Sequence, residues 1–252
     1  MRLKLTLDRG NTCIKAALWS EDGQLVAREL GDESQSAGDL VEQLASRHLA
    51  EGEIFDAIAW CTVVESEHAD DEASLVGKAR RVIELTAATP MHLRIAYQTP
   101  ATLGSDRIAA ALGAIAVAGT RRPILVSDIG TAVTYDYVAV GSHYLGGNIA
   151  PGIGLRLRAL AAFTDALPAV DVNGGEIPVW GRTTSEAMRS GAVRGLAAEL
   201  EYYHRAAGND AIAVITGGSA ELLVKANLLT FDYIYDPCLV HKGLFSIIKD
   251  EN

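Results

Sequence analysis

The sequence has few cysteines, no long apolar run and no excess of positive charge, and each absence excludes a class of protein. Cys13, Cys61 and Cys238 are widely separated and lack the spacing of metal ligands, so we expect reduced thiols in a cytoplasmic protein. The longest apolar run, Ile108 to Gly119, is too short to cross a bilayer. The net charge of −10 argues against nucleic acid or an anionic membrane as a partner.

A short glycine motif near the N-terminus lies between two alternating apolar runs. The motif spans Asp8 to Lys15, and the alternation on either side of it predicts a strand, a tight turn and a second strand. Gly10 and Asn11 favour a two-residue hairpin turn, because both residues tolerate positive φ. The alternative to a functional loop is an ordinary hairpin turn.

A similar motif occurs in the second half of the chain. The stretch Ile124 to Ser127 leads into Asp128-Ile129-Gly130-Thr131-Ala132-Val133-Thr134-Tyr135-Asp136. Both motifs place Asp-x-Gly and then a threonine at the tip of a predicted hairpin. The repetition predicts a duplicated fold with two phosphate-binding loops.

The remaining pattern alternates helices and strands in both halves. We expect a boundary near residues 119–123 and therefore two domains, 1–119 and 120–252, each with a mixed sheet flanked by helices. The predicted helices are 38–50, 69–85, 108–118, 153–163, 184–207 and 239–248. The predicted later strands are 24–30, 57–62, 91–96, 124–127, 132–138, 143–145 and 211–215, and 146–152 is a predicted loop.

The two repeated loops have the groups that phosphoryl transfer requires. Turn N–H groups can bind phosphate oxygens, hydroxyls and a lysine add donors and charge, and the leading carboxylates can hold cations. Such groups stabilise the charge that spreads over the transferred phosphoryl oxygens. The residues concerned are Asp8, Gly10, Asn11, Thr12, Lys15, Asp128, Gly130 and Thr131.

Two further motifs lie at predicted helix starts. In Gly104-Ser105-Asp106-Arg107, Asp106 is either a general base for a substrate hydroxyl or a helix cap, and spacing alone does not separate these roles. Arg107 can hold a carboxylate or phosphate in fork geometry. Thr216-Gly217-Gly218-Ser219 either admits a flat ring or phosphate close to the backbone or is a tight strand-to-helix turn.

In order along nearly the whole chain, these motifs resemble those of the type III pantothenate kinases, a branch of the actin/hexokinase/Hsp70 superfamily. The resemblance includes the two Asp-x-Gly loops and Tyr97-x-x-Pro100-x-x-Leu103-Gly104-x-Asp106-Arg107. It also includes Gly146-Gly147-x-Ile149-x-Pro151-Gly152, Thr184-x-x-Ala187-x-x-x-Gly191 and Thr216-Gly217-Gly218. One departure is Thr62-Val63-Val64-Glu65, where the family often has a proline after the valines; we expect a local change in a loop without loss of activity.

The resemblance implies an α/β fold of duplicated actin-like (ribonuclease H-like) domains with mixed five-stranded sheets. It implies transfer of the ATP γ-phosphate to pantothenate, giving 4′-phosphopantothenate in the first step of coenzyme A synthesis. The cofactors it implies are ATP, Mg²⁺ and a monovalent cation, K⁺ or NH₄⁺, and the assembly it implies is a homodimer with pantothenate close to the subunit interface.

The roles that the resemblance implies fall on residues of both halves. Asp106 is the implied catalytic base. Pantothenate contacts are implied for Tyr97, Gly104, Ser105, Asp106, Arg107 and Thr184. ATP contacts are implied for Asp8, Arg9, Gly10, Asn11, Thr12, Cys13, Ile14, Lys15 and Thr131. The implied cation ligands are Asp8 for Mg²⁺ and Asp128 for the monovalent cation.

Two other functions use the same superfamily fold. One is a non-catalytic regulatory protein of the Bvg accessory factor type; the presence together of Asp8, Lys15, Asp106, Arg107 and Asp128 favours catalysis instead. The other is a different phosphotransferase or a phosphatase, which the match of the Tyr97-to-Arg107 substrate segment argues against. Fold alone does not separate these functions.

Overall fold

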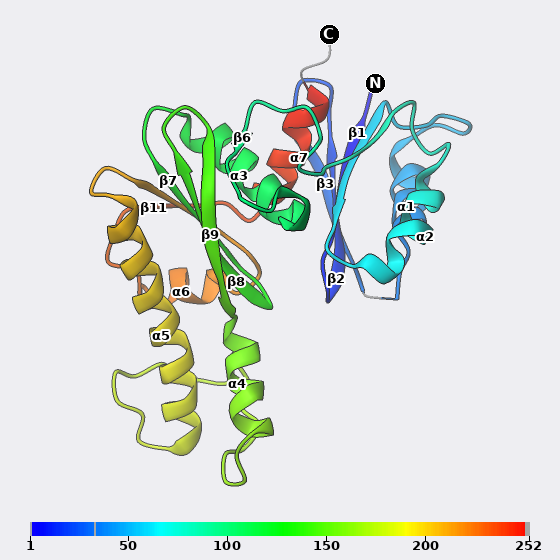
Figure 1. Cartoon of the computed structure of the whole chain (residues 1–252). Coiled ribbons are helices and arrows are strands. Elements are labelled where there is room, and N and C mark those ends of the chain that lie inside the picture. Colours follow the sequence, from blue (N-terminus) through cyan, green and yellow to red (C-terminus); the bar gives the residue numbers. More distant parts are fainter. Residues whose placement is uncertain (1, 33, 250–252) are drawn as a thin grey trace. The chain divides into compact units, whose positions relative to one another are not determined.

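The computed structural model describes residues 2–32 and 34–249 and contains two compact units (Figure 1). One unit comprises the described residues up to Val117 together with those from Cys238 onward, and the other is Ala118–Pro237. The C-terminal helix α7 (Leu239–Lys249) packs against the first and fourth strands. The sequence predicted a division at residue 119 with this helix in the second domain, whereas the contacts group it with the first.

Unit 1 is built on a mixed sheet of five strands in the described part of the chain. Their order is β3-β2-β1-β4-β5, with β1 antiparallel to β2 and parallel to β4. The strands are β1 (Lys4–Arg9), β2 (Cys13–Trp19), β3 (Leu25–Asp32), β4 (Ala57–Thr62) and β5 (Val82–Glu84); β6 (Arg94–Ile95) follows. The helices are α1 (Ala37–His48), α2 (His68–Leu75) and α3 (Ser105–Ala118), with short 3₁₀ turns η1 (Glu65–Glu67) and η2 (Pro100–Thr102).

Unit 2 repeats the strand order of unit 1. Its strands are hydrogen-bonded in the order β9-β8-β7-β10-β11, again antiparallel on one side of the central strand and parallel on the other. The sheet to which they belong has six strands among the described residues, one more than expected. The elements are β7 (Ile124–Ile129), β8 (Ala132–Ala139), β9 (His143–Pro151), β10 (Ile212–Thr216), β11 (Tyr233–Tyr235), α4 (Ile153–Ala162), α5 (Thr184–Ala207) and α6 (Ala220–Lys225).

Two sequence predictions of secondary structure were wrong. The helix expected over 69–85 ends at Leu75, because Gly77 turns the chain with a φ of 76° and β5 then begins at Val82. The loop expected over 146–152 is largely strand, since β9 continues to Pro151 and pairs with β8. Among the described residues, every helix is too short or too polar to span a membrane.

The core of unit 1 forms where the apolar face of the sheet meets α1. Leu5, Leu7 and Ile14 from the hairpin pack with Leu40 and Leu44 of the helix. A capping box at Ser36 fixes the start of α1, because Ser36 Oγ accepts the Asp39 N–H and the Asp39 carboxylate accepts the Ser36 N–H. In Figure 1, α1 and α2 lie on one face of this sheet and α7 on the other.

Helices α3 and α7 touch through their backbones at two glycines. A Cβ on Gly113 would lie 2.0 Å from the Leu239 carbonyl oxygen, and one on Gly243 would lie 1.8 Å from the Ala109 carbonyl oxygen. Contacts this short are not possible, so both positions require glycine.

We predict that Gly243→Ala lowers the free energy of unfolding of unit 1 by about 1–3 kcal/mol, because the helices must separate to admit the methyl group. Gly195→Ala on α5 is the matched control. Its Cβ would meet only Arg156 Nη1 at 3.6 Å, so we expect a gain of about 0.5–1 kcal/mol from the better helix former. Chemical denaturation of both variants measures the difference, and equal stability of the two would contradict the packing argument.

Candidate active site

The first Asp-x-Gly loop joins β1 to β2 in unit 1. Asp8 pairs in register with Lys15, and Lys15 Nζ lies 3.5 Å from Asp8 Oδ2. Gly10 N–H donates to the Cys13 carbonyl at 3.0 Å, which leaves Asn11 and Thr12 as the two-residue turn, one position later than the Gly10-Asn11 turn expected. Gly10 and Asn11 do not have positive φ, so the prediction of a turn that needs it was wrong. Asn11 and Thr12 are exposed at the tip of the loop.

Two side chains of this segment point away from the loop surface. Ile14 is fully buried in the core with α1. Arg9 is 3% exposed, and its guanidinium donates to the Asp71 carboxylate. Any contact of these residues with a nucleotide at the tip of the loop would therefore involve backbone groups, since both side chains are occupied elsewhere.

The substrate segment of the sequence prediction forms the start of α3. Asp106 Oδ1 accepts the N–H of the next residue, Arg107, at 2.8 Å. A capping side chain accepts from the second or third N–H of its helix, and α3 already begins at Ser105, so this bond is not an N-cap. A Cβ on Gly104 would lie 2.5 Å from the same Asp106 oxygen, so glycine leaves the space that this carboxylate occupies. Arg107 is buried, and its guanidinium carbon lies 5.9 Å from the centre of the Tyr97 ring.

Cys61, which the sequence indicated only as a small buried residue, lies beside Asp8, one of the predicted functional carboxylates. It is the register partner of Asp8 across the parallel pair β1 and β4, and its Sγ is 3.7 Å from Asp8 Oδ1. Burial raises the pKa of the Cys61 thiol, and the negative charges of Asp8 and Asp106 raise it further. Unit 1 thus brings Asp8 and Asp106 into the electrostatic range of one thiol.

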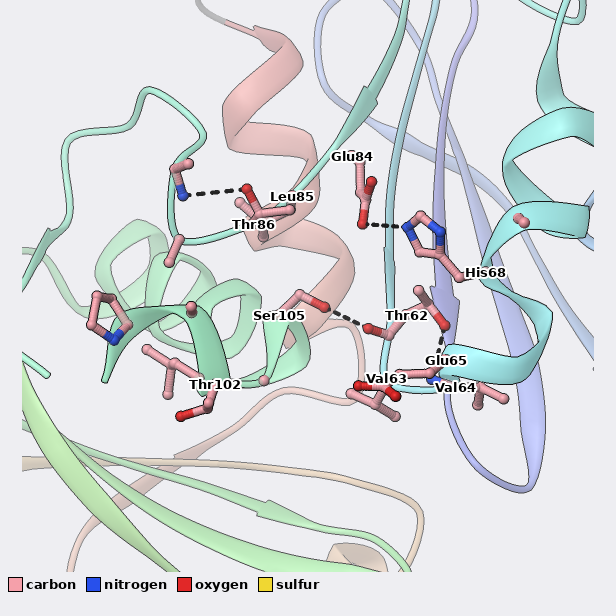
Figure 2. Close-up of a pocket in the computed structure, with 17 residues that line it drawn as sticks. Thr62, Val63, Val64, Glu65, His68, Glu84, Leu85, Thr86, Thr102 and Ser105 are labelled. Atoms are coloured by element: carbon pink, nitrogen blue, oxygen red, sulfur yellow. Dashed lines mark hydrogen bonds and ion pairs between the residues drawn. The ribbon is translucent and has the colours of Figure 1, made fainter. Parts of the chain in front are cut away.

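A cavity of about 1100 Å³ opens beside the start of α3 (Figure 2). Ser105 Oγ donates to the Thr62 carbonyl at 2.8 Å and joins two of its walls. Figure 2 shows His68 and Glu84 pointing toward one another, with His68 Nε2 2.9 Å from Glu84 Oε1. The lining is otherwise mainly apolar or hydroxylic and includes Val63, Val64, Leu85, Thr86, Thr102, Leu103 and Gly104.

The second Asp-x-Gly loop joins β7 to β8 in unit 2 and touches two of the other glycine motifs. Gly217 has a φ of 99°, and a Cβ there would lie 2.4 Å from Asp128 Oδ1. A Cβ on Gly152 would lie 2.2 Å from the Gly130 carbonyl oxygen. The structure therefore brings together three motifs that are far apart in the sequence.

A cavity of about 350 Å³ lies beside this second loop. Its lining includes Gly130 and Thr131 of the loop, and Gly218 and Ser219 of the strand-to-helix turn. The lining also includes the cationic side chains of Arg158 and Lys225, which sequence reasoning did not select. Arg158 lies on α4, one helical turn after Gly154. The helix follows the Gly146–Gly152 motif directly, and this closeness in sequence could have indicated Arg158 as a candidate.

Thr184 lies in unit 2, at the first position of α5, and its side chain is exposed. The cap of this helix is the preceding residue, Thr183, whose hydroxyl accepts the Glu186 N–H at 3.2 Å. Thr184 is therefore available to a ligand, and its contact with substrate stays a prediction.

Comparison with known proteins gives one consistent family. The profile of the type III pantothenate kinases matches residues 4–206. The chain is 34% identical over 253 residues to the type III pantothenate kinase of Phocaeicola vulgatus, covering 98% of each chain. It is 33% identical over 257 residues to that of Porphyromonas gingivalis, covering 99% of each.

Solved structures share the fold at low sequence identity. A Campylobacter jejuni protein named for the Baf family of transcriptional activators aligns with a TM-score of 0.61 at 22% identity, over 98% of both chains. The activator of 2-hydroxyisocaproyl-CoA dehydratase from Clostridium difficile, with bound ADPNP, aligns with a TM-score of 0.56 at 15% identity, over 98% of this chain and 95% of that one. The ParM protein of psk41 aligns with a TM-score of 0.52 at 11% identity, over 98% and 96%. These likenesses confirm the predicted actin-like fold.

The His68–Glu84 pair makes stability depend on pH. The hydrogen bond that the His68 ring donates to the Glu84 carboxylate raises the pKa of His68 above its ordinary value of 6.5. A raised pKa means that the pair stabilises the fold fully below about pH 6.5 and loses this effect as the pH rises through the folded pKa.

We predict that His68→Gln lowers the melting temperature at about pH 5.5 and has less effect at about pH 8.5. His92→Gln, at an exposed histidine in the same unit, is the control and should have the same small effect at both pH values. Thermal unfolding at the two pH values gives the comparison. A His68→Gln effect that is independent of pH would show that the ion pair does not form.

Proposed function

We propose residue roles from the premise that this chain belongs to the type III pantothenate kinase family of the actin-like ATPase superfamily. It is a phosphotransferase that uses ATP to phosphorylate pantothenate in coenzyme A biosynthesis. The regulatory alternative has no separate support, because the likeness to the Baf-named protein, at 22% identity, concerns the fold alone.

The observation that carries the proposal is the grouping of Asp8, Lys15 and Asp106 in unit 1. Lys15 Nζ lies 3.5 Å from Asp8 Oδ2 and Cys61 Sγ lies 3.7 Å from Asp8 Oδ1, and the negative charge of Asp106 helps to raise the pKa of the same thiol. A carboxylate and a lysine on the two strands below the loop suit the Mg²⁺ and phosphate end of ATP, and a second carboxylate suits the acceptor hydroxyl. Asp106 would accept the hydroxyl proton as the phosphoryl group is transferred.

Pantothenate would occupy the large cavity beside the start of α3. Gly104 and Ser105 line it, and Asp106 follows them directly. Apolar walls from Val63, Val64 and Leu103 suit the geminal methyl groups of pantothenate. Arg107, held against Tyr97, would provide a guanidinium fork for the carboxylate. Thr184, in unit 2, stays a predicted pantothenate contact.

ATP would be held by loop backbone and by a few charged groups. The exposed tip residues Asn11 and Thr12, with Lys15, would bind phosphate oxygens in unit 1. Thr131, in unit 2, stays a predicted ATP contact. Mg²⁺ keeps several waters and needs only one or two carboxylates, so Asp8 fits as its ligand. The bound Mg²⁺ would neutralise charge on the phosphates.

The monovalent cation would bind at Asp128. Thr134 is the register partner of Asp128 on β8. Its buried Oγ1 has no hydrogen-bond partner among the described residues. A carboxylate and an unused hydroxyl oxygen form a donor set that suits a hard cation such as K⁺ or NH₄⁺.

The free thiols of Cys13, Cys61 and Cys238 support a cytoplasmic location.

We predict that Asp106→Asn lowers kcat by about 10²–10⁴-fold, because the amide cannot accept the hydroxyl proton. Binding of ATP should remain, since the phosphate loop is unchanged. A coupled assay with ATP, Mg²⁺, K⁺ and pantothenate measures turnover, and calorimetry measures ATP binding. Asp70→Asn on α2 is the control and should keep normal turnover. Near-normal turnover of Asp106→Asn would remove Asp106 from the mechanism.

The homodimer would use the α4–α5 pair of unit 2. The segment between these helices exposes Phe163 (87%), Val179 and Trp180 (85%), and large apolar side chains exposed together mark interaction surfaces. A second copy is the partner that the family implies. Figure 1 shows the two helices extending side by side from the sheet, and α4 contacts α5.

We predict that Phe163→Ser combined with Trp180→Ser shifts the protein toward monomers, because the substitutions remove the apolar surface that would be buried in the dimer. Sedimentation velocity across a range of concentrations measures the shift. Leu30→Ser, at another exposed apolar residue on β3 (70%), is the control and should not change the oligomeric state. An unchanged dimer in the double variant would place the interface elsewhere.

A further inference from the structure

Arg9 is the second residue of the first Asp-x-Gly motif, yet its side chain leaves the loop and enters the interior of unit 1. Its Nε and Nη2 donate to the two carboxylate oxygens of Asp71 at 2.8 and 2.9 Å. Arg9 and Asp71 are 3% and 2% exposed. This is the parallel two-bond geometry that gives an arginine–carboxylate pair its orientational precision.

The same two side chains hold two other segments. Arg9 Nη2 also donates to the Gln35 carbonyl at 2.8 Å, and Arg9 Nη1 lies 3.4 Å from Glu67 Oε2. Asp71 Oδ1 also accepts the Ala37 N–H at 2.9 Å. The network thus ties the end of β1 to the start of α1 and to the η1–α2 segment.

Both predicted substrate regions adjoin this network. On one side, Arg9 is flanked by Asp8 and Gly10 of the phosphate loop. On the other, Glu67 lies between Glu65 and His68, which line the large cavity. One buried guanidinium therefore fixes the strand end that carries Asp8 and also contacts the wall of the cavity proposed for pantothenate.

Stability alone does not account for such a pair. A buried ion pair often contributes no more stability than apolar residues of similar volume, because both charges must leave water. What a fork does supply is a single position and orientation for the groups it joins. Because neighbouring residues of a strand point to opposite faces, holding Arg9 on one face fixes where Asp8 points on the other.

We propose that Arg9 is a positioning residue for phosphate binding, and that its fork with Asp71 holds the Asp8–Thr12 loop in the geometry that binds Mg·ATP. The proposal rests on the proposed function. Arg9 touches neither substrate through its side chain. It acts through the strand end, so its loss weakens the binding of phosphate in the ground state and the transition state alike.

Arg9→Lys is the sharpest test, because it keeps the charge that neutralises Asp71 and removes the fork. One ammonium group cannot reproduce both parallel bonds to Asp71 and the bond to the Gln35 carbonyl. We expect KM for Mg·ATP to rise about tenfold with kcat within about threefold of wild type, because a loss of uniform binding raises KM alone. KM for pantothenate should rise less than KM for Mg·ATP.

Asp71→Asn tests the same fork from the other side. Asparagine keeps an oxygen for the Ala37 N–H and loses the charged acceptor, so the same rise in KM for Mg·ATP is expected. This variant also gives the answer if Arg9→Lys does not fold. Thermal unfolding of each variant is measured beside its kinetics.

Two controls separate positioning from general destabilisation. Leu44→Ala removes buried volume from α1 in the same unit and should lower the melting temperature without changing KM for Mg·ATP. Arg47→Lys alters an exposed arginine–carboxylate pair with Glu29 and should change neither quantity.

A wild-type KM for Mg·ATP in Arg9→Lys, or an equal rise in Leu44→Ala, would overturn the positioning role while pantothenate phosphorylation by the wild type stands. A wild-type protein that does not phosphorylate pantothenate would overturn the proposed function itself.

Discussion

The parallel pairing of each sheet's central strand is the interaction on which the rest of the site depends. In unit 1, β1 and β4 run parallel and place Asp8 beside Cys61. In unit 2, β7 and β10 run parallel and place Asp128 beside Thr216. Parallel strands end at the same edge of a sheet, and ligand sites in open α/β sheets form at that edge. Each unit therefore places the aspartate of its hairpin beside the residues that follow the parallel neighbour strand, β4 in unit 1 and β10 in unit 2.

The two units repeat this arrangement with different side chains opposite the aspartate. Across the antiparallel pair, Asp8 faces Lys15 in unit 1, whereas Asp128 faces Thr134 in unit 2. A lysine at this position provides a positive charge for phosphate, and a threonine provides a neutral oxygen for a cation. One duplicated hairpin thus suits two different tasks, and the difference comes from a single cross-strand partner.

The sequence predicted best where one local rule decided the structure. Alternation and an Asp-x-Gly turn located both hairpins, and the helix from Thr184 to Ala207 matched its predicted bounds. Prediction failed where a distant contact decided it. The pairing of β9 with β8 extends through a glycine-rich stretch that resembles a loop, and Gly77 ends a helix that the charge distribution over residues 69–85 predicted to continue.

The inward direction of the Arg9 side chain could not be predicted locally either. Its partner Asp71 lies 62 positions away in the sequence, and an arginine beside a phosphate motif favours the interpretation that it binds phosphate. Cys61 shows the same limit, because only the register of β1 against β4 brings it to Asp8. These residues acquire their roles from tertiary packing, which short motifs do not encode.

The glycine motifs were nevertheless informative, for a reason that the structure makes clear. Gly104, Gly152 and Gly217 each lie where a Cβ would collide with a carboxylate or carbonyl oxygen of a predicted site segment. These glycines contribute no reactive group. Their missing side chains leave the space that Asp106, Gly130 and Asp128 occupy. Any side chain there would displace one of these oxygens, so these motifs mark how the loops pack. A sequence pattern can therefore identify the family through packing, while the role of each polar residue must be tested one substitution at a time.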